Sequence, residues 1–196
     1  MTETNLPKRV LLVGGTSLIG QSIAGKNGVE IVTPTRNELD LLDANSIKKY
    51  SFQNFDCLIL VAGAGMRHGR TFTFAEDDVD VDYITNTIGV NCTGNTLLLK
   101  EYLSNNKKGH VVVIGSVVVN DLKNTNVVYS SSKMYLDRLI DLLENLYTDT
   151  TFIKINPGAV RSRNQKDLQK SIDPEDVADF VWKAIQSNIK RIDITK

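Results

Sequence analysis

The chain has 196 residues, of which 41% are hydrophobic and 23% charged, and its 23 Lys and Arg residues balance 23 Asp and Glu residues. This length suits a single folded domain spanning residues 1–196, and the hydrophobic fraction is too high for a disordered protein. A net charge of zero argues against a dedicated nucleic-acid-binding or acidic-lipid-binding protein. No apolar run approaches the ~18 residues of a membrane span, and the polar N-terminus lacks a signal-peptide pattern.

The chain contains two cysteines, Cys57 and Cys92, which are too few for a disulfide framework. Neither lies in a Cys-x-x-Cys or Cys/His spacing, so no metal site is predicted. Both are therefore interpreted as buried thiols in a reducing compartment. Together with the composition, they predict a cytoplasmic protein with no membrane or nucleic-acid partner.

Short apolar runs and helical patterns alternate along the chain. The predicted strands are Lys8–Val13, Val29–Thr33, a brief one at Leu39–Leu42, Asp56–Ala62, His110–Ile114, Phe152–Ile155 and Arg191–Ile194. The predicted helices are Gly20–Ala24, about Ala44 to Tyr50, roughly Val79–Leu103, Val127–Tyr147, and one that begins at Pro174 behind an Asp173 N-cap. This alternation predicts an α/β fold, a Rossmann-like, doubly wound parallel sheet of about seven strands flanked by helices.

A glycine cluster follows the first predicted strand and opens the first predicted helix. Glycines let the backbone approach a pyrophosphate closely, and the start of a helix offers free N–H groups to its oxygens. The cluster therefore predicts a dinucleotide phosphate site, whose contact residues are Gly14, Thr16, Ser17, Leu18, Ile19 and Gly20. The strict G-x-G-x-x-G spacing is absent, so a strand–helix turn without a ligand is the alternative at this point.

The end of the second predicted strand indicates which dinucleotide is bound. NAD-binding folds usually place Asp or Glu there, about 20 residues beyond the first glycine, for the ribose 2′-hydroxyl. This sequence has Arg36, a side chain suited to a 2′-phosphate through paired, charge-assisted hydrogen bonds. NADP(H) is therefore favoured over NAD(H). Two alternatives stay open at this point: a solvated Arg36, and a Glu38 that reaches the ribose.

Tyr129 and Lys133 lie four residues apart on the Val127–Tyr147 helix, which places them on one face, one turn apart. A phenol with a pKa near ~10 is a poor base at neutral pH, and a nearby cation favours its ionised form. Such pairs also arise by chance, so corroboration is needed. It comes from Asn91, which interrupts the long helix, and from Ser116, which ends a strand at the carboxyl edge, where open α/β sheets bind ligands.

With these residues, the sequence resembles the short-chain dehydrogenase/reductase family over nearly its whole length, from Arg9 to about Ile194. The family's Asn–Ser–Tyr–Lys tetrad maps in order onto Asn91, Ser116, Tyr129 and Lys133. The resemblance implies further cofactor contacts at Asp40, Leu41, Ala62, Gly63, Pro157, Gly158, Val160 and Ser162, besides Tyr129 and Lys133 themselves.

The resemblance implies an NADP(H)-dependent oxidoreductase that transfers hydride between the nicotinamide and a small-molecule carbonyl or alcohol substrate. Tyr129 would act as the general acid/base, and Ser116 would hydrogen-bond the substrate oxygen. Lys133 would lower the pKa of Tyr129 and bind the ribose hydroxyls, while Asn91 would hold a water in the proton relay.

The sequence departs from the family pattern after the fourth predicted strand, where the usual Asn-Asn-Ala-Gly is Leu60-Val61-Ala62-Gly63. The loss of both asparagines keeps a non-catalytic NADP(H)-binding or sensing module open. A nucleotide-sugar epimerase shares the Tyr–Lys chemistry and is a further alternative with less support, because this chain has no space for the substrate domain that such enzymes normally need. The segment Arg161–Lys170 is short, polar and basic, which predicts an anionic or small polar substrate. By analogy with the family, the two long helices predict a homodimer or homotetramer.

Overall fold

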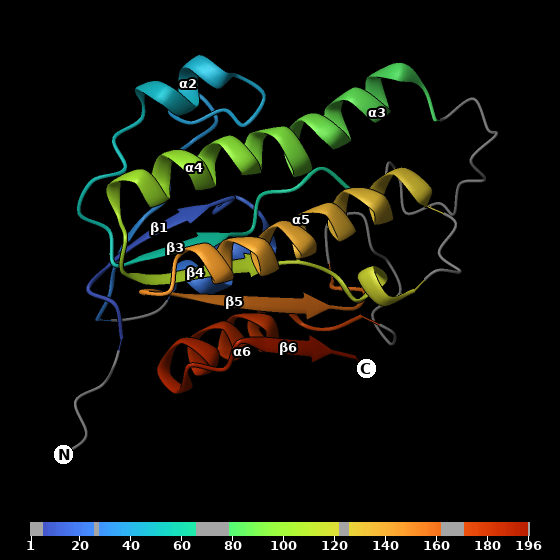
Figure 1. Ribbon diagram of the computed structural model, residues 1–196. Coiled ribbons are helices and arrows are strands. Elements are labelled where there is room, and N and C mark those ends of the chain that lie inside the picture. Colours follow the sequence, from blue (N-terminus) through green and yellow to red (C-terminus); the bar gives the residue numbers. More distant parts are fainter. Residues whose placement is uncertain (1–5, 26–27, 66–78, 122–125, 162–170, 196) are drawn as a thin grey trace.

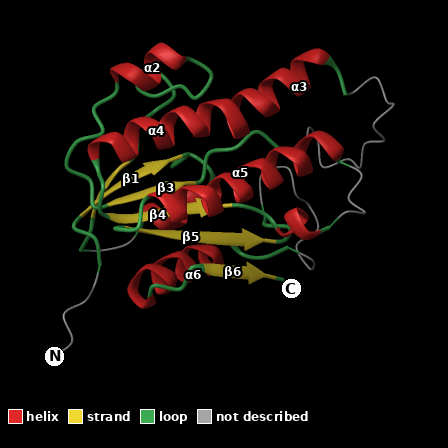
Figure 2. Ribbon diagram, viewed as in Figure 1, coloured by secondary structure: helices red, strands yellow, loops and turns green. Residues whose placement is uncertain are grey.

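The computed structural model describes residues 6–25, 28–65, 79–121, 126–161 and 171–195. Within them, six strands form one parallel sheet in the order β2-β1-β3-β4-β5-β6. The strands are β1 (Arg9–Val13), β2 (Glu30–Val32), β3 (Cys57–Leu60), β4 (Gly109–Ile114), β5 (Thr150–Pro157) and β6 (Arg191–Ile194). Figure 1 shows the sheet with helices packed against it, and Figure 2 separates the two kinds of element.

The central strands are apolar at successive positions because both faces of the sheet are covered. Leu11 and Val13 of β1 belong to one buried cluster, whereas Val10 and Leu12 belong to a second cluster on the opposite face. This alternation is the period of a β-strand, in which neighbouring side chains point to opposite sides. A strand buried on both faces therefore reads as a continuous apolar run, as the sequence predicted.

Two layers of helices cover these two faces. The cluster that contains Leu11 is completed by residues of α2 (Ala44–Lys49), η1 (Gly89–Gly94), α4 (Asn95–Asn105) and α5 (Val127–Leu146). The helix α3 (Val81–Ile88) leads directly into η1 and α4. The opposite cluster is completed by α1 (Leu18–Ala24) and α6 (Pro174–Ser187). The predicted fold class, a doubly wound parallel α/β sheet, is confirmed.

The predicted brief strand at Leu39–Leu42 is wrong, because this segment contains a turn and irregular backbone and pairs with no strand. Its backbone hydrogen bonds are made locally: the Asp40 N–H donates to the Ser46 hydroxyl at 2.9 Å, and the Leu42 N–H donates to Asp40 Oδ1 at 2.9 Å. Leu39 and Leu41 are buried, which explains the apolar signal. A β-carbon on Gly94 would lie 2.3 Å from the Leu41 carbonyl oxygen, so the segment packs closely on the π-helical turn η1 rather than on the edge of β2.

Within the described part of the chain, no helix is both long enough and apolar enough to cross a membrane. Whether the protein is cytoplasmic and homo-oligomeric stays a prediction.

Candidate functional site

A cleft of about 300 Å³ lies at the carboxyl ends of β1 and β3. Its walls are the glycine turn after β1, the segment after β2, the segment after β3, and the helix that leads into η1. The lining residues are Val13, Gly14, Gly15, Thr16, Ser17, Pro34, Arg36, Leu39, Asp40, Leu41, Val61, Ala62, Gly63, Ala64, Asn86 and Val90. The structure therefore brings together the predicted contacts of the glycine turn, Arg36, the Asp40–Leu41 pair and the Ala62–Gly63 pair.

The glycine turn fits closely against its neighbours because glycine stands at positions 14, 15 and 20, where a β-carbon would overlap nearby atoms. Gly14 has φ +100°, and a β-carbon there would lie 2.5 Å from the Ala62 backbone nitrogen. A β-carbon on Gly20 would lie 2.3 Å from the Gly14 carbonyl oxygen, so α1 is seated directly against the turn. These contacts leave the turn as an open backbone wall of the cleft, which a pyrophosphate can approach.

Other residues of the predicted phosphate site play different parts. The Ser17 hydroxyl donates to the Gly14 carbonyl at 2.9 Å and accepts the Gly20 N–H at 3.0 Å, so it organises the turn itself. Leu18 is the first residue of α1, and Ile19 packs against the apolar cluster on the α1 and α6 face; neither lines the cleft. Cofactor contacts by these two residues stay predictions.

The turn that follows β2 engages Glu38 and leaves Arg36 exposed. The Glu38 carboxylate accepts the Thr35 N–H at 2.7 Å and the Thr35 hydroxyl at 2.9 Å, and these bonds lower the pKa of Glu38. Arg36 is exposed and lines the cleft, and none of the described residues forms an ion pair with it. The cation is therefore available to a ligand, whereas the carboxylate is engaged in the turn.

Asn91 lies in η1, a π-helical turn inside the long helix, and is fully buried. Its side-chain oxygen accepts the Ala64 N–H at 2.8 Å, and its amide nitrogen donates to the Ala64 carbonyl at 2.8 Å and to the Ser132 hydroxyl at 2.9 Å. The Ser132 hydroxyl in turn donates to the Tyr129 carbonyl at 2.7 Å. Asn91 thus ties the segment after β3 to α5. That it also holds a water stays a prediction.

Tyr129 and Lys133 project from the first turns of α5 toward the end of β4. The Lys133 side chain is buried, and its Nζ donates to the Ile114 carbonyl at 3.3 Å and lies 5.8 Å from the centroid of the Tyr129 ring. Ser116 follows β4, is buried, and begins the short 3-10 helix η2 (Val117–Asn120). The structure therefore places the predicted tetrad residues Ser116, Tyr129 and Lys133 at one end of the sheet.

Burial is the largest cause of the pKa shifts of Tyr129 and Lys133. It raises the pKa of Tyr129 above 10, and a hydrogen bond with the Ser116 hydroxyl lowers that pKa only in part. Burial also lowers the pKa of Lys133 from its ordinary 10.5 to about 8. The contribution that lowers the Tyr129 pKa comes from Ser116, and the expectation that Lys133 lowers it as well stays a prediction. Perturbed groups of this kind cluster at functional sites.

The segment after β3 joins the cleft to the tetrad. Gly63 lines the cleft, and a β-carbon there would lie 3.2 Å from Asn91 Oδ1 and 3.3 Å from Lys133 Nζ. A β-carbon on Gly65 would lie 3.9 Å from Tyr129 Cε2. Residues 63–65 therefore run past three of the four tetrad residues, at distances that leave little room for larger side chains.

The remaining predicted contacts follow β5. Pro157 ends that strand, and the Gly158 N–H donates to the Ile194 carbonyl at 2.8 Å. Val160 makes an isolated parallel bridge with Ile172. The predicted contact Ser162 and most of the basic segment Arg161–Lys170 lie outside the described residues. The cofactor roles of Pro157, Gly158 and Val160 stay predictions.

Sequence reasoning missed several residues of this site. Asn86 and Val90 reach the cleft from α3 and η1, and Ala64 and Ser132 hold the Asn91 side chain. The signal for Ser132 was present, because a residue three positions after Tyr129 lies on the same face of a helix. Among the described residues, no group of three or more His, Cys, Asp or Glu side chains is arranged so that it could hold a metal ion.

Comparisons with known proteins agree with this fold. A family model described as short chain dehydrogenase matches residues 35–173. No curated protein matches the sequence. The structure of the chain is similar to that of an alcohol dehydrogenase from the archaeon Thermococcus sibiricus complexed with 5-hydroxy-NADP, with a TM-score of 0.81, 20% identity, and coverage of 96% of both chains.

Two further solved structures share the fold. A short chain dehydrogenase from Burkholderia cenocepacia J2315 in complex with NADP has a TM-score of 0.85 at 13% identity, covering 98% of this chain and 90% of the other. A short-chain dehydrogenase from Sphingobium yanoikuyae in complex with NADPH has a TM-score of 0.79 at 18% identity, covering 96% and 87%.

Proposed function

Because the chain belongs to the short-chain dehydrogenase family of NAD(P)-dependent oxidoreductases, we propose that it transfers hydride between NADP(H) and a carbonyl or alcohol substrate. The observation that carries this proposal is the course of residues 63–65. Gly63 and Ala64 form part of the wall of the cleft, Ala64 hydrogen-bonds Asn91, and β-carbons on Gly63 and Gly65 would contact Lys133 and Tyr129. One extended ligand that occupies the cleft would therefore bring its far end to the tetrad.

The described residues fit a phosphorylated dinucleotide. A β-carbon on Gly14 would overlap the Ala62 backbone, so the turn holds its place beside the cleft only with glycine at this position. Asp40 and Leu41 line the same cleft as Arg36, where an adenosine would lie in this proposal. The engagement of Glu38 by Thr35 supports NADP(H) over NAD(H), since the carboxylate that would repel a 2′-phosphate is held by the turn.

When bound, the nicotinamide supplies the hydride, and the chain's own residues handle the proton. In reduction, Tyr129 Oη would donate a proton to the substrate oxygen, and the Ser116 hydroxyl would hydrogen-bond the same oxygen to orient it. Lys133 would place its ammonium beside the Tyr129 ring and stabilise the phenolate that remains. Asn91 would keep residues 63–65 in position, through its bonds to Ala64.

The ionisation of these groups suits the reductive direction at neutral pH. The raised pKa of Tyr129 keeps the phenol protonated, which is the state that a general acid requires. Lys133, with a pKa of about 8, is mostly charged at pH 7. We therefore propose carbonyl reduction as the reaction that the site favours near neutrality.

The test is a Tyr129→Phe variant beside a Tyr135→Phe control. Tyr135 lies on the same helix, but its exposed hydroxyl hydrogen-bonds Thr96 at 2.9 Å, away from the site. Thermal melting with NADPH, NADP, NADH and NAD in parallel measures binding, and loss of NADPH absorbance with a panel of small ketones and aldehydes measures turnover. We expect Tyr129→Phe to bind NADPH and lose at least about 100-fold in kcat.

The outcomes are distinct. Selective stabilisation by the phosphorylated pair, abolished by Arg36→Ala, supports Arg36 as the ligand of the 2′-phosphate. Equal turnover by the wild type and Tyr129→Phe removes the catalytic role of Tyr129. No melting shift with any of the four dinucleotides refutes the proposed function.

A further inference from the structure

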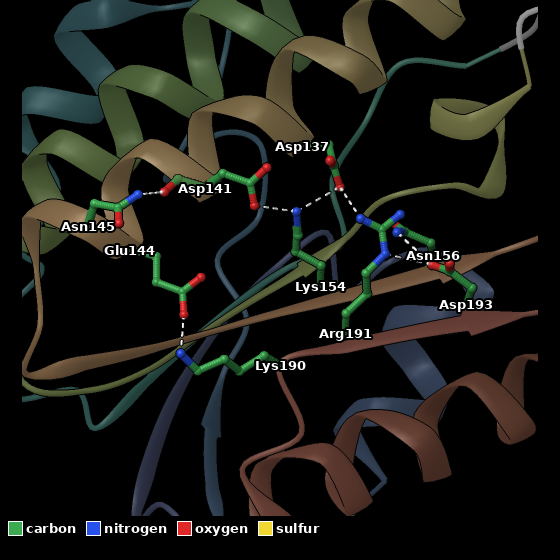
Figure 3. Close-up of polar contacts among 9 residues, drawn as sticks. All are labelled: Asp137, Asp141, Glu144, Asn145, Lys154, Asn156, Lys190, Arg191 and Asp193. Carbon is green, nitrogen blue, oxygen red and sulfur yellow. Dashed lines mark hydrogen bonds and ion pairs between the residues drawn. The ribbon is translucent and has the colours of Figure 1, made fainter.

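A polar cluster lies between α5 and strands β5 and β6, beyond the tetrad along the same helix (Figure 3). Lys154 of β5 and Arg191 of β6 are direct partners in the register of the two strands. Two cations placed opposite each other on neighbouring strands repel, which destabilises the pair unless an anion lies between them. The Lys154 side chain is 11% exposed, so water screens its charge little.

Asp137 of α5 supplies that anion. Its Oδ1 lies 3.2 Å from Lys154 Nζ and 3.8 Å from Arg191 Nη1, and its side chain is 18% exposed. Asp141, one turn further along α5, accepts a hydrogen bond of 2.6 Å from the same Lys154 Nζ. Two consecutive turns of α5 therefore contact the two facing cations through Asp137 and Asp141, as Figure 3 shows.

The cluster continues to the strand end that carries Ser116. Asp193 Oδ1 accepts hydrogen bonds from Arg191 Nε at 3.2 Å and from Asn156 Nδ2 at 2.9 Å. Asn156 is buried, and a β-carbon on Gly115 would lie 2.1 Å from its Oδ1. Asn156 therefore packs directly on the residue that precedes Ser116. The two elements that carry Ser116, Tyr129 and Lys133, which are the end of β4 and α5, therefore both contact this cluster.

Tyr129, Lys133 and Asp137 follow one another at intervals of four residues, so each lies about one turn after the last on α5. We propose that Asp137 is a positioning residue, which docks α5 on the cation pair Lys154 and Arg191 and so sets where Tyr129 and Lys133 stand over the end of β4. This inference rests on the proposed oxidoreductase function for its catalytic meaning, but not for its geometry.

The chain offers a matched control. Glu144, two turns beyond Asp137 on α5, pairs with Lys190 just before β6. The Lys190 side chain is 67% exposed, and exposed ion pairs contribute little to the free energy of folding. Glu144→Gln therefore removes one carboxylate from the same helix without changing the ion pairs of Lys154 and Arg191.

The experiment compares Asp137→Asn and Glu144→Gln in the full chain, and measures the pKa of Lys133 by NMR of ¹³Cε-labelled lysine without cofactor. Lys133→Met assigns the signal. Loss of the Asp137 charge alone lowers the Lys133 pKa, because a nearby carboxylate favours the cation. Displacement of α5 raises it, because water returns to a buried ammonium. The sign of the shift separates the two effects.

We expect Asp137→Asn to raise the Lys133 pKa by about one unit, from its value of about 8, and Glu144→Gln to leave it unchanged. The kcat of Asp137→Asn should fall about tenfold, and KM for NADPH should change less than kcat, because the residues that line the cofactor cleft lie on elements other than α5. If Asp137→Asn does not fold, Asp137→Asn with Lys154→Met leaves no unpaired buried cation and should give the same upward shift.

A lower melting temperature with an unchanged or lowered Lys133 pKa and unchanged kcat would reduce Asp137 to a purely structural role and overturn the inference. An upward shift in a chain that neither binds NADPH nor reduces any carbonyl would support the docking while refuting the proposed function.

Discussion

Replacing Lys133 by methionine should stabilise the protein while abolishing its turnover. Lys133 is 6% exposed, and among the described residues its ammonium donates one hydrogen bond, to the Ile114 carbonyl at 3.3 Å, and lies 5.8 Å from the centroid of the Tyr129 ring. A buried ammonium with so few partners carries an unfavourable desolvation free energy, which appears as its lowered pKa. Methionine has a similar length and no charge, so it removes that cost.

The size of the effect follows from the pKa. The shift from 10.5 to about 8 corresponds to about 3 kcal/mol of native-state destabilisation by the charged form, at about 1.4 kcal/mol per pH unit. Loss of the hydrogen bond to Ile114 costs about 1 kcal/mol. The net expectation is about 2 kcal/mol of added stability at pH 7, or a rise in Tm of about 5 °C for a chain of this length.

The effect of Lys133 on stability depends on pH. Because the folded pKa of Lys133 lies below its unfolded value, the unfolded chain binds more protons between about pH 8 and 10.5. The wild type therefore gains stability from Lys133 as pH rises through this window, whereas the variant does not. The advantage of Lys133→Met should be full below pH 8 and gone near pH 10.

The assay is urea unfolding of both proteins at pH 7, 8.5 and 10, with Lys154→Met as the matched control. Lys154 is also largely buried, but it is paired with Asp137 and Asp141, so its loss should destabilise the fold by about 2 kcal/mol. Destabilisation by Lys133→Met at pH 7, or an advantage that does not change with pH, would refute the assignment of a costly buried charge at this position.

Two further predictions concern the same site. Reduction of a carbonyl by NADPH should hold steady from pH 6 to 7.5 and decline above about pH 8 as Lys133 loses its proton, while Tyr129 stays protonated because its pKa is raised; a pH profile of kcat checks this. Gly14→Ala should lower stability by about 2 kcal/mol and weaken NADPH binding at least tenfold, because its β-carbon meets the Ala62 nitrogen at 2.5 Å with φ +100°; melting with and without NADPH measures both.

The Gly14→Ala prediction has a matched control, and the pH profile has an outcome that would contradict it. Gly28 also has a positive φ, +81°, but its β-carbon would meet nothing within 4 Å, so Gly28→Ala isolates backbone strain from the clash at Gly14. Equal losses in both variants would show that close packing on Ala62 is not the cause. A decline of reduction that begins below pH 7 would indicate that a group other than Lys133 controls the rate.

Much of the fold was predictable because its signals are local. Runs of consecutive apolar residues predict strands buried on both faces, and all six observed strands overlap predicted ones. Leu39–Leu42 misled the prediction because two buried leucines look alike in a strand and in a turn. What decided the turn was a pair of side-chain bonds to the backbone, from Asp40 and Ser46, which leave no periodic trace in the sequence.

The sequence by itself determined the order of the strands and helices, the glycine turn, and the spacing of Tyr129 and Lys133 on one helix face, since each depends on neighbouring residues. Only the tertiary structure decided that Glu38 is engaged by Thr35, that residues 63–65 connect the cleft to the tetrad, and that Asp137 meets two facing cations. The last two unite segments far apart in the chain. Their free energy depends on distance, burial and charge after folding, none of which residue type and spacing express.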